Sequence, residues 1–250
     1  MSSCIGWGTP TMLRADGLEE FYGLLARLEK RVGAKRRLAD CHGRLPWPSR
    51  GVYFFFEDGE NRATDATLLR IVRVGTHALG ETSRTTLWNR LSQHRGVAST
   101  GAGNHRGSIF RALVGEALQM RTGGVVVQSW GIAGDLRTAA LGLGLTVEAV
   151  KAAELPIEQA VSVHIQSMPF LWLDVDDPPG RENPRGYIER NAIALLSNLG
   201  KDPIDSQSVS WLGAFSRRER VRRSGLWNNN HVDENWDPGF LDHFAHLVEA

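Results

Sequence analysis

Two short runs of β-forming residues, separated by a polar segment, constrain the fold of this chain more than any other feature. Residues 51–57 read GVYFFFE and residues 68–75 read LLRIVRVG. Apolar runs of this kind suit strands that are covered on both faces. The segment between them opens with Asp58-Gly59, a pair typical of hairpin turns. We therefore expect an antiparallel hairpin, joined by a third strand at MPFLWLDV, residues 168–175.

Amphipathic segments on either side of these runs predict helices, because their apolar residues recur at helical spacing. Helices are expected over 16–32, 84–96, 109–121, 146–165 and 187–198, with a last one beginning near Pro238. Pro156 leaves open whether 146–165 forms one helix or two, and GGVVVQSWGI, residues 123–132, could be a strand. The expected fold class is α+β, a small three-stranded antiparallel sheet flanked by helices, with helical insertions and N- and C-terminal extensions.

The composition excludes several classes of protein. The 29 basic residues nearly balance the 28 acidic ones, so affinity for an anionic polymer must come from local clusters of charge. Two cysteines are too few for a disulfide scaffold. No apolar run approaches the roughly 20 residues of a membrane span. We expect a cytoplasmic protein with no membrane partner.

The helix expected over 84–96, RTTLWNRLSQHRG, carries two polar side chains beside its apolar stripe. Arg90 and His94 are four residues apart, and a rotation of about 100° per residue puts them on one face that borders the stripe. Both groups would then be partly desolvated. Alternatively, Arg90 pairs with a surface carboxylate and His94 is an ordinary cation near the C-terminus of the helix.

A second anomaly lies on the helix expected over 187–198. Glu189 falls inside its apolar sector. A buried carboxylate implies a shifted pKa, an arginine opposite it, or a metal ion. The structural alternative is an ion pair, with Arg190 or another arginine. Tyr53, on strand 51–57, likewise needs a hydrogen-bond partner for its phenol if it is buried, although core tyrosines are common.

The order of these features resembles the GIY-YIG nuclease superfamily. Gly-Val-Tyr at 51–53 stands at the first tripeptide of that pattern, and Arg-Val-Gly at 73–75 stands at the second. Arg90, His94 and Glu189 match the family's arginine, histidine and metal-binding glutamate. Each motif is short, but together they occur in the family's order on the expected elements.

The resemblance covers roughly residues 50–200 and includes two departures. Arg73 stands where the family usually has a second tyrosine, and the stretch between Gly96 and Glu189 is far longer than usual, which implies inserted helices. Asn198, which closes the same helix as Glu189, would match the polar residue often found downstream of that glutamate.

This resemblance divides the chain into three parts. Residues 1–48 would be an N-terminal helical extension. Residues 49–200 would be the GIY-YIG-like catalytic core, with a helical insertion at about 100–165. Residues 201–250 would be a C-terminal extension packed on the core.

The resemblance implies a divalent-metal-dependent endonuclease that hydrolyses phosphodiester bonds in DNA, in a restriction or defence setting for example, with RNA left open as a substrate. Glu189 would hold one Mg²⁺ or Mn²⁺ ion. Arg90 would contact the non-bridging phosphate oxygens as a rigid fork, and Arg73 would be a further phosphate contact. Tyr53 would be the general base, with His94 as the competing candidate.

Local clusters would supply the binding surface. The residues expected to contact nucleic acid are Arg84, Arg95, His105, Arg106, Asn198, Arg222 and Arg223. The basic block 217–223 and the following WNNNH, residues 227–231, could follow a phosphate backbone and read base edges. A solvated, salt-bridged helix explains the same block.

Two other functions and the oligomeric state remain open at this point. The chain could be a catalytically inactive nucleic-acid-binding module on the same fold. It could also be a structural or partner-binding protein in which Glu189 and Arg90 form a buried ion pair.

Overall fold

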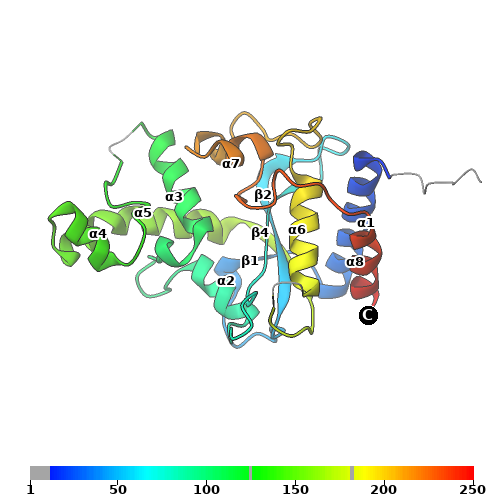
Figure 1. Cartoon of the computed structure of the whole chain (residues 1–250), viewed down its shortest axis with the longest axis horizontal. Coiled ribbons are helices and arrows are strands. Elements are labelled where there is room, and N and C mark those ends of the chain that lie inside the picture. Colours follow the sequence, from blue (N-terminus) through cyan, green and yellow to red (C-terminus); the bar gives the residue numbers. More distant parts are fainter. Residues whose placement is uncertain (1–11, 124–125, 181–182) are drawn as a thin grey trace, which may run out of the picture.

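The computed structural model describes residues 12–123, 126–180 and 183–250, and its central feature is an antiparallel sheet between two groups of helices (Figure 1). The strands are β1 Arg36–Arg37, β2 Gly51–Asn61, β3 Leu69–Gly75 and β4 Pro169–Asp174. The α-helices are α1 Arg14–Val32, α2 Leu87–Arg95, α3 Ile109–Arg121, α4 Leu136–Leu143, α5 Val147–Ser167, α6 Pro184–Leu196, α7 Glu219–Ser224 and α8 Gly239–Glu249. In this part of the chain, no helix combines the length and the apolar character that crossing a membrane requires.

The strands follow the order β1-β4-β2-β3, and each neighbouring pair is antiparallel. The predicted hairpin is confirmed, since β2 pairs with β3 and places Tyr53 opposite Gly75. The α+β class is also confirmed, although the sheet has four strands where three were expected. The additional strand, β1, consists of two arginines that pair with β4. Two arginines carry none of the apolar or β-branched character by which a strand is recognised in a sequence.

One face of the sheet packs against α1, α6 and α8. The ring of Phe54 on β2 lies 5.9 Å from that of Phe21 on α1 and 5.8 Å from that of Phe244 on α8. Figure 1 shows α1 and α8 side by side, with α6 next to the sheet. Helices from the beginning and the end of the chain therefore share one core with α6.

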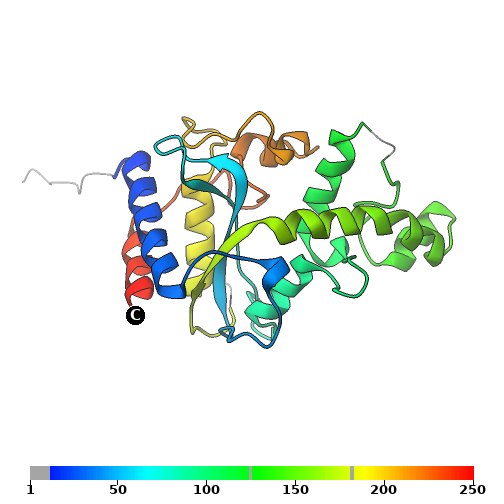
Figure 2. The same cartoon turned by 180° about the vertical axis from the view of Figure 1, so that it is seen from behind.

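The other face packs against α2, α3, α5 and the segment around α7 (Figure 2). Pro156 lies inside α5, so residues 146–165 belong to one helix, and its exposed ring points away from the core. The possible strand at 123–132 is not found in the described part of that segment, and residues 124–125 lie outside it. There the Val127 amide bonds to the side chain of Gln119, which gives its backbone a partner other than a strand.

A β-bulge in β3 places an arginine on this second face. Phe55 pairs with Arg73 and Phe56 pairs with Ile71, which leaves Val72 as the extra residue. Bulges of this kind re-aim side chains and often lie next to functional sites. The bulge directs Arg73 toward the side of the sheet on which Tyr53 lies.

Candidate active site

Three of the predicted site residues line one cavity of about 700 Å³. They are Arg73 from β3, Arg90 from α2 and Glu189 from α6. A capping box fixes the start of α2, because the side chains of Thr86 and Asn89 each accept a backbone N–H from the other residue. The cap sets which residues of α2 face the cavity, and it places Arg90 at its wall.

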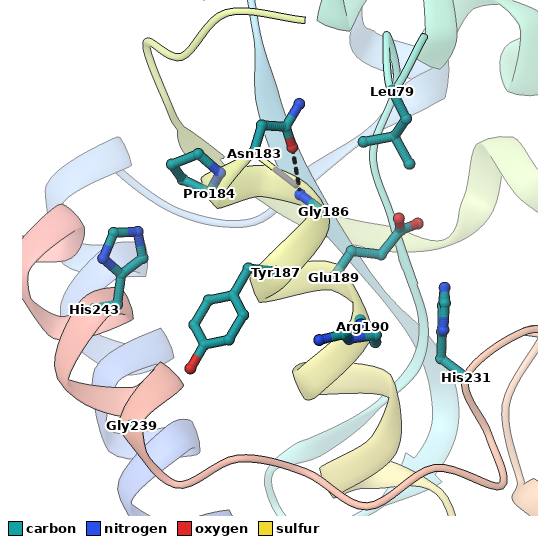
Figure 3. A pocket seen from close by; sticks show the side chains of 10 residues that line it. All are labelled: Leu79, Asn183, Pro184, Gly186, Tyr187, Glu189, Arg190, His231, Gly239 and His243. Carbon is teal, nitrogen blue, oxygen red and sulfur yellow. Dashed lines mark hydrogen bonds between the residues drawn. The ribbon is translucent and has the colours of Figure 1, made fainter. Parts of the chain in front are cut away.

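Glu189 is partly exposed, and its carboxylate points away from α6 toward the loop that carries Leu79 (Figure 3). Its Oε1 accepts the Thr76 N–H at 3.1 Å. Burial raises the pKa of the carboxyl, and the positive charge of Arg73 partly opposes this effect. Within the described residues Glu189 forms no ion pair. The proposed pair with Arg190 is therefore wrong, and that arginine lies 3.9 Å from a carboxylate of Glu234.

The donor set at Glu189 fits a divalent cation that the substrate helps to hold. One carboxylate oxygen accepts the Thr76 N–H, and the other has no hydrogen-bond partner among the side chains and backbone that the structure describes. The same residues contain no group of three or more His, Cys, Asp or Glu side chains suited to a metal ion. Mg²⁺ commonly binds through one or two carboxylates, several waters and substrate phosphates. A single carboxylate facing an open cavity meets that requirement for Mg²⁺ or Mn²⁺.

The guanidinium of Arg90 is available to an anion. Its Nη1 donates to Gln93 Oε1 at 3.0 Å and to the Gly107 carbonyl at 3.2 Å. Within residues 12–123, 126–180 and 183–250, its buried Nε has no hydrogen-bond partner. In the part of the chain described, Arg90 pairs with no carboxylate, neither one at the surface nor that of Glu189. Both structural alternatives for this arginine are therefore wrong.

Tyr53 and His94 lie behind the cavity and are fully buried. The phenol oxygen is 2.8 Å from His94 Nε2, and Nδ1 of the same ring is 2.9 Å from Ser108 Oγ. Burial, together with the charges of Arg90 and Arg73, lowers the pKa of His94 well below its usual value. The imidazole is therefore neutral near pH 7, and its interpretation as a helix-end cation is wrong.

Arg73 lies next to the phenol and has its own fixed contacts. Its Nη1 donates to the Trp227 carbonyl, and its guanidinium lies 4.7 Å from the centre of the Phe110 ring. Burial lowers the pKa of Arg73, while the charges of Tyr53 and Glu189 oppose the shift. The arginine at the place of the second tyrosine thus contacts the pair behind the cavity and also lines the cavity itself.

The contact between Gly75 and the ring of Tyr53 explains why the second tripeptide ends in glycine. A Cβ at this position would lie 2.4 Å from the Tyr53 hydroxyl oxygen, which is far closer than van der Waals contact allows. Only glycine lets the phenol lie against the end of β3. The two tripeptides are therefore complementary in shape as well as paired in the sheet.

Sequence reasoning missed His77, which lies two residues beyond the second tripeptide. Its side chain lines the cavity, the residue is 5% exposed, and neither ring nitrogen has a hydrogen-bond partner among the residues described. Burial, and then the charge of Arg185, lowers the pKa of His77 to about 4. Its position after 73–75 is the one signal that could have drawn attention to it.

Replacing His77 with phenylalanine is expected to make the fold less sensitive to acid. Unfolded histidine has a pKa of about 6.5, so below that pH the unfolded chain binds a proton before the folded one does. The free energy of unfolding therefore falls until the folded state also titrates near 4. Wild type should lose roughly 2–3 kcal/mol more than His77→Phe between pH 7 and 4.5, as measured by urea unfolding. The same substitution at the exposed His246 provides the control. An equal loss of unfolding free energy in His77→Phe and wild type would contradict the burial argument.

The amide-rich tail completes the wall of the cavity. Asn228 accepts the Val74 N–H at 3.1 Å and donates to the Val74 carbonyl at 2.8 Å. Its side chain thereby occupies part of the open edge of β3. Asn229, Asn230 and His231 continue along the cavity. The segment that was expected to read base edges thus borders the same cavity as the two arginines and Glu189.

The other residues predicted to contact nucleic acid do not line this cavity. His105 is buried and bonds to Glu158, so its ring offers no surface to a polynucleotide. Arg106 binds both carboxylate oxygens of Glu154 at 2.7 Å. Arg95 is bonded to the Leu38 carbonyl. These basic groups satisfy buried carboxylates and carbonyls of the protein itself.

The remaining predicted contacts also lie elsewhere. Asn198 accepts a hydrogen bond from Arg14, and Arg84 is exposed at a separate hollow. In the block 217–223, Arg222 donates to a backbone carbonyl and Arg223 pairs with Glu219 one turn before it. This part of the chain matches the salt-bridged helix that was the alternative interpretation.

Comparison with known proteins agrees with this geometry. The family model described as the GIY-YIG domain matches residues 12–250. No curated protein and no solved structure matches the chain. The family match includes both tripeptides and every residue that lines the cavity. The chain therefore belongs to the GIY-YIG family, whose members are generally endonucleases.

Proposed function

We propose that this protein is a divalent-metal-dependent endonuclease that hydrolyses phosphodiester bonds in DNA. One observation carries the proposal: Glu189, Arg73 and Arg90 line a single open cavity, while the carboxylate is not neutralised by any arginine among the described residues. An uncompensated carboxylate beside two guanidinium groups suits a site that receives both a cation and a phosphate.

The two arginines would bind the phosphoryl group. Arg90 lines the cavity, and its Nη2 bonds to no residue that the structure describes; Arg73 lines the same cavity from β3. Guanidinium groups bind phosphate oxygens in a fixed geometry and stabilise the charge that develops on them during transfer. A divalent cation bound at Glu189 would add further positive charge at the reacting phosphate.

Tyr53 would accept the proton of the attacking water. The phenol would first release its proton to solvent. Neutral His94 would then donate its Nε2–H to the phenolate, and its Nδ1 would accept the Ser108 hydroxyl. The guanidinium of Arg73 would stabilise the resulting phenolate. Because the phenol is fully buried, the water would have to reach it at the inner wall of the cavity, beside Arg73.

The inactive nucleic-acid-binding module is the alternative, because Arg73 replaces the second tyrosine. The free carboxylate favours catalysis over this alternative. A module that only binds DNA gains nothing from a carboxylate in a phosphate site, since like charges repel.

Incubation with DNA and metal tests the proposal. We expect purified protein to cut supercoiled plasmid with Mg²⁺ or Mn²⁺ and not with a chelator. Among the described residues Glu189 forms no ion pair with an arginine that could take the place of the metal ion. Parallel reactions on single-stranded DNA and on duplex RNA define the substrate. Retention of DNA in a gel shift without cleavage in either metal would favour the inactive module. An absence of both retention and cleavage would contradict both functions.

A further inference from the structure

A second cavity, of about 730 Å³, adjoins the first at Glu189, and Figure 3 shows the side chains that line it. The two cavities share Leu79, Glu189 and His231 as lining residues. The carboxylate therefore stands between two adjoining hollows. A polymer bound with one phosphate at Glu189 has to continue away from that point, and the second cavity lies directly beside it.

The walls of this second cavity come from α6 and from the start of α8. Tyr187 lines it, and its hydroxyl donates to Asp237 Oδ2 at 2.7 Å. The ring of His243 meets the Tyr187 ring edge to face, with centroids 6.1 Å apart. The Tyr187 side chain is thus held by a hydrogen bond at its hydroxyl and by the contact of its ring with His243.

The chemistry of the lining is mixed. Tyr187, Pro184 and Leu79 present apolar faces, while His243 and Arg190 present polar groups. The His243 Nε2 atom is buried and has no hydrogen-bond partner in the part of the chain that the structure describes. Among the described residues that line this cavity, Glu189 is the one carboxylate. A ligand that fits has a flat apolar face, hydrogen-bonding edges and a negative charge near Arg190.

We propose that the second cavity binds the nucleoside next to the cleaved phosphate, with its base against the ring of Tyr187 and a base edge bonded to His243. This proposal rests on the proposed function. The volume falls within the range of roughly 300–1,000 Å³ that is usual for small-ligand sites. Stacking on an aromatic ring binds any base, so the subsite would position the strand without selecting a sequence by itself.

Fluorescence of 2-aminopurine tests this subsite directly. Once the cleaved bond has been mapped with wild type and Mg²⁺, single-stranded oligonucleotides carry the probe at successive positions around that bond. Binding is measured in chelator, where no cleavage occurs. We expect the emission to change on binding at one position adjacent to the bond. Tyr187→Ala should remove this change and weaken Kd roughly 5- to 150-fold, the effect of losing one base–aromatic stack.

Two further variants keep the test independent of folding. Tyr187→Phe retains the ring and loses only the hydrogen bond to Asp237, so it should keep the fluorescence change and bind within a few-fold of wild type. Gly239→Leu fills the cavity, and its Cβ would meet no atom closer than 3.4 Å. This variant should weaken binding as Tyr187→Ala does, at an unchanged Tm. Phe215→Ala, at an exposed aromatic residue that lines neither cavity, is the control.

The outcomes separate this proposal from the proposed function. Wild-type affinity and emission in both Tyr187→Ala and Gly239→Leu would overturn the subsite, while metal-dependent cleavage by wild type would still support the endonuclease. An equal loss in Tyr187→Phe and Tyr187→Ala would assign the effect to the hydroxyl and overturn the stacking. If wild type neither binds nor cuts DNA, the proposed function fails and the subsite fails with it.

Discussion

Replacing Glu189 with glutamine is expected to lower metal-dependent cleavage by about 10³-fold or more while DNA binding persists. Glutamine has the same size and can still accept the Thr76 N–H through its amide oxygen. The substitution removes the negative charge that would hold the cation, and charge stabilisation by a metal ion contributes several kcal/mol to the transition state. Glu189→Ala should be equally inactive.

Initial rates on supercoiled plasmid at saturating Mg²⁺ measure this effect, and fluorescence anisotropy in chelator measures DNA binding. Glu148→Gln, which alters an exposed carboxylate at the start of α5, should cut at the wild-type rate. Continued nicking by Glu189→Gln would remove this residue from the mechanism. A lower Tm with unchanged cleavage would instead make it a structural residue.

The position of Glu189 illustrates what a sequence pattern can predict. Its place within the apolar sector of the helix expected over 187–198 indicated an inward-facing carboxylate. The structure places it in that direction, facing the cavity. The same type of pattern put Arg90 and His94 on one face of α2, and both do point inward. The helical projection gave their direction but not their depth, so it did not separate the arginine at the cavity from the histidine in the core.

Depth and pairing depend on segments that are distant in the sequence. Asn228 bonds to the backbone of Val74 from 154 residues away, and no local periodicity encodes such a contact. The bulge at Val72 and the two-residue β1 are similar cases, because each is defined by its partner strand. For this reason the hairpin and the major helices could be predicted, whereas the tail that lines the cavity could not.

The basic residues were the least reliable indicators of the nucleic-acid-binding surface. Arg106, His105 and the buried Arg111 all face α5, where they bind Glu154 and Glu158. Those two carboxylates are four residues apart on one helix, and such spacing on a buried face is a signal that partners must be supplied. The acidic and basic residues considered together would have assigned these basic side chains to the protein interior.

Loss of the proposed general base is the second substitution for which we expect a large effect. Tyr53→Phe should lower kcat by about 10²- to 10⁴-fold, the usual contribution of a general base. The phenylalanine ring fits the same space against Gly75. The hydrogen bond to His94 is lost together with the interaction of the phenol oxygen with Arg73, and the unpaired imidazole nitrogen costs roughly 1–3 kcal/mol in stability. Single-turnover rates and chemical denaturation measure the two effects separately.

A double-mutant cycle with His94→Gln then separates the two candidates for the base. If the phenol and the imidazole act as one unit, each single variant loses about as much activity as the double variant. The effects of groups that act as a unit are strongly non-additive. If His94 were the base by itself, Tyr53→Phe would keep most of its activity and His94→Gln would lose nearly all of it. The 2.8 Å contact between the two groups favours the first result. Both side chains are fully buried, but the phenol lies beside Arg73, which lines the cavity, whereas the imidazole contacts the phenol and Ser108.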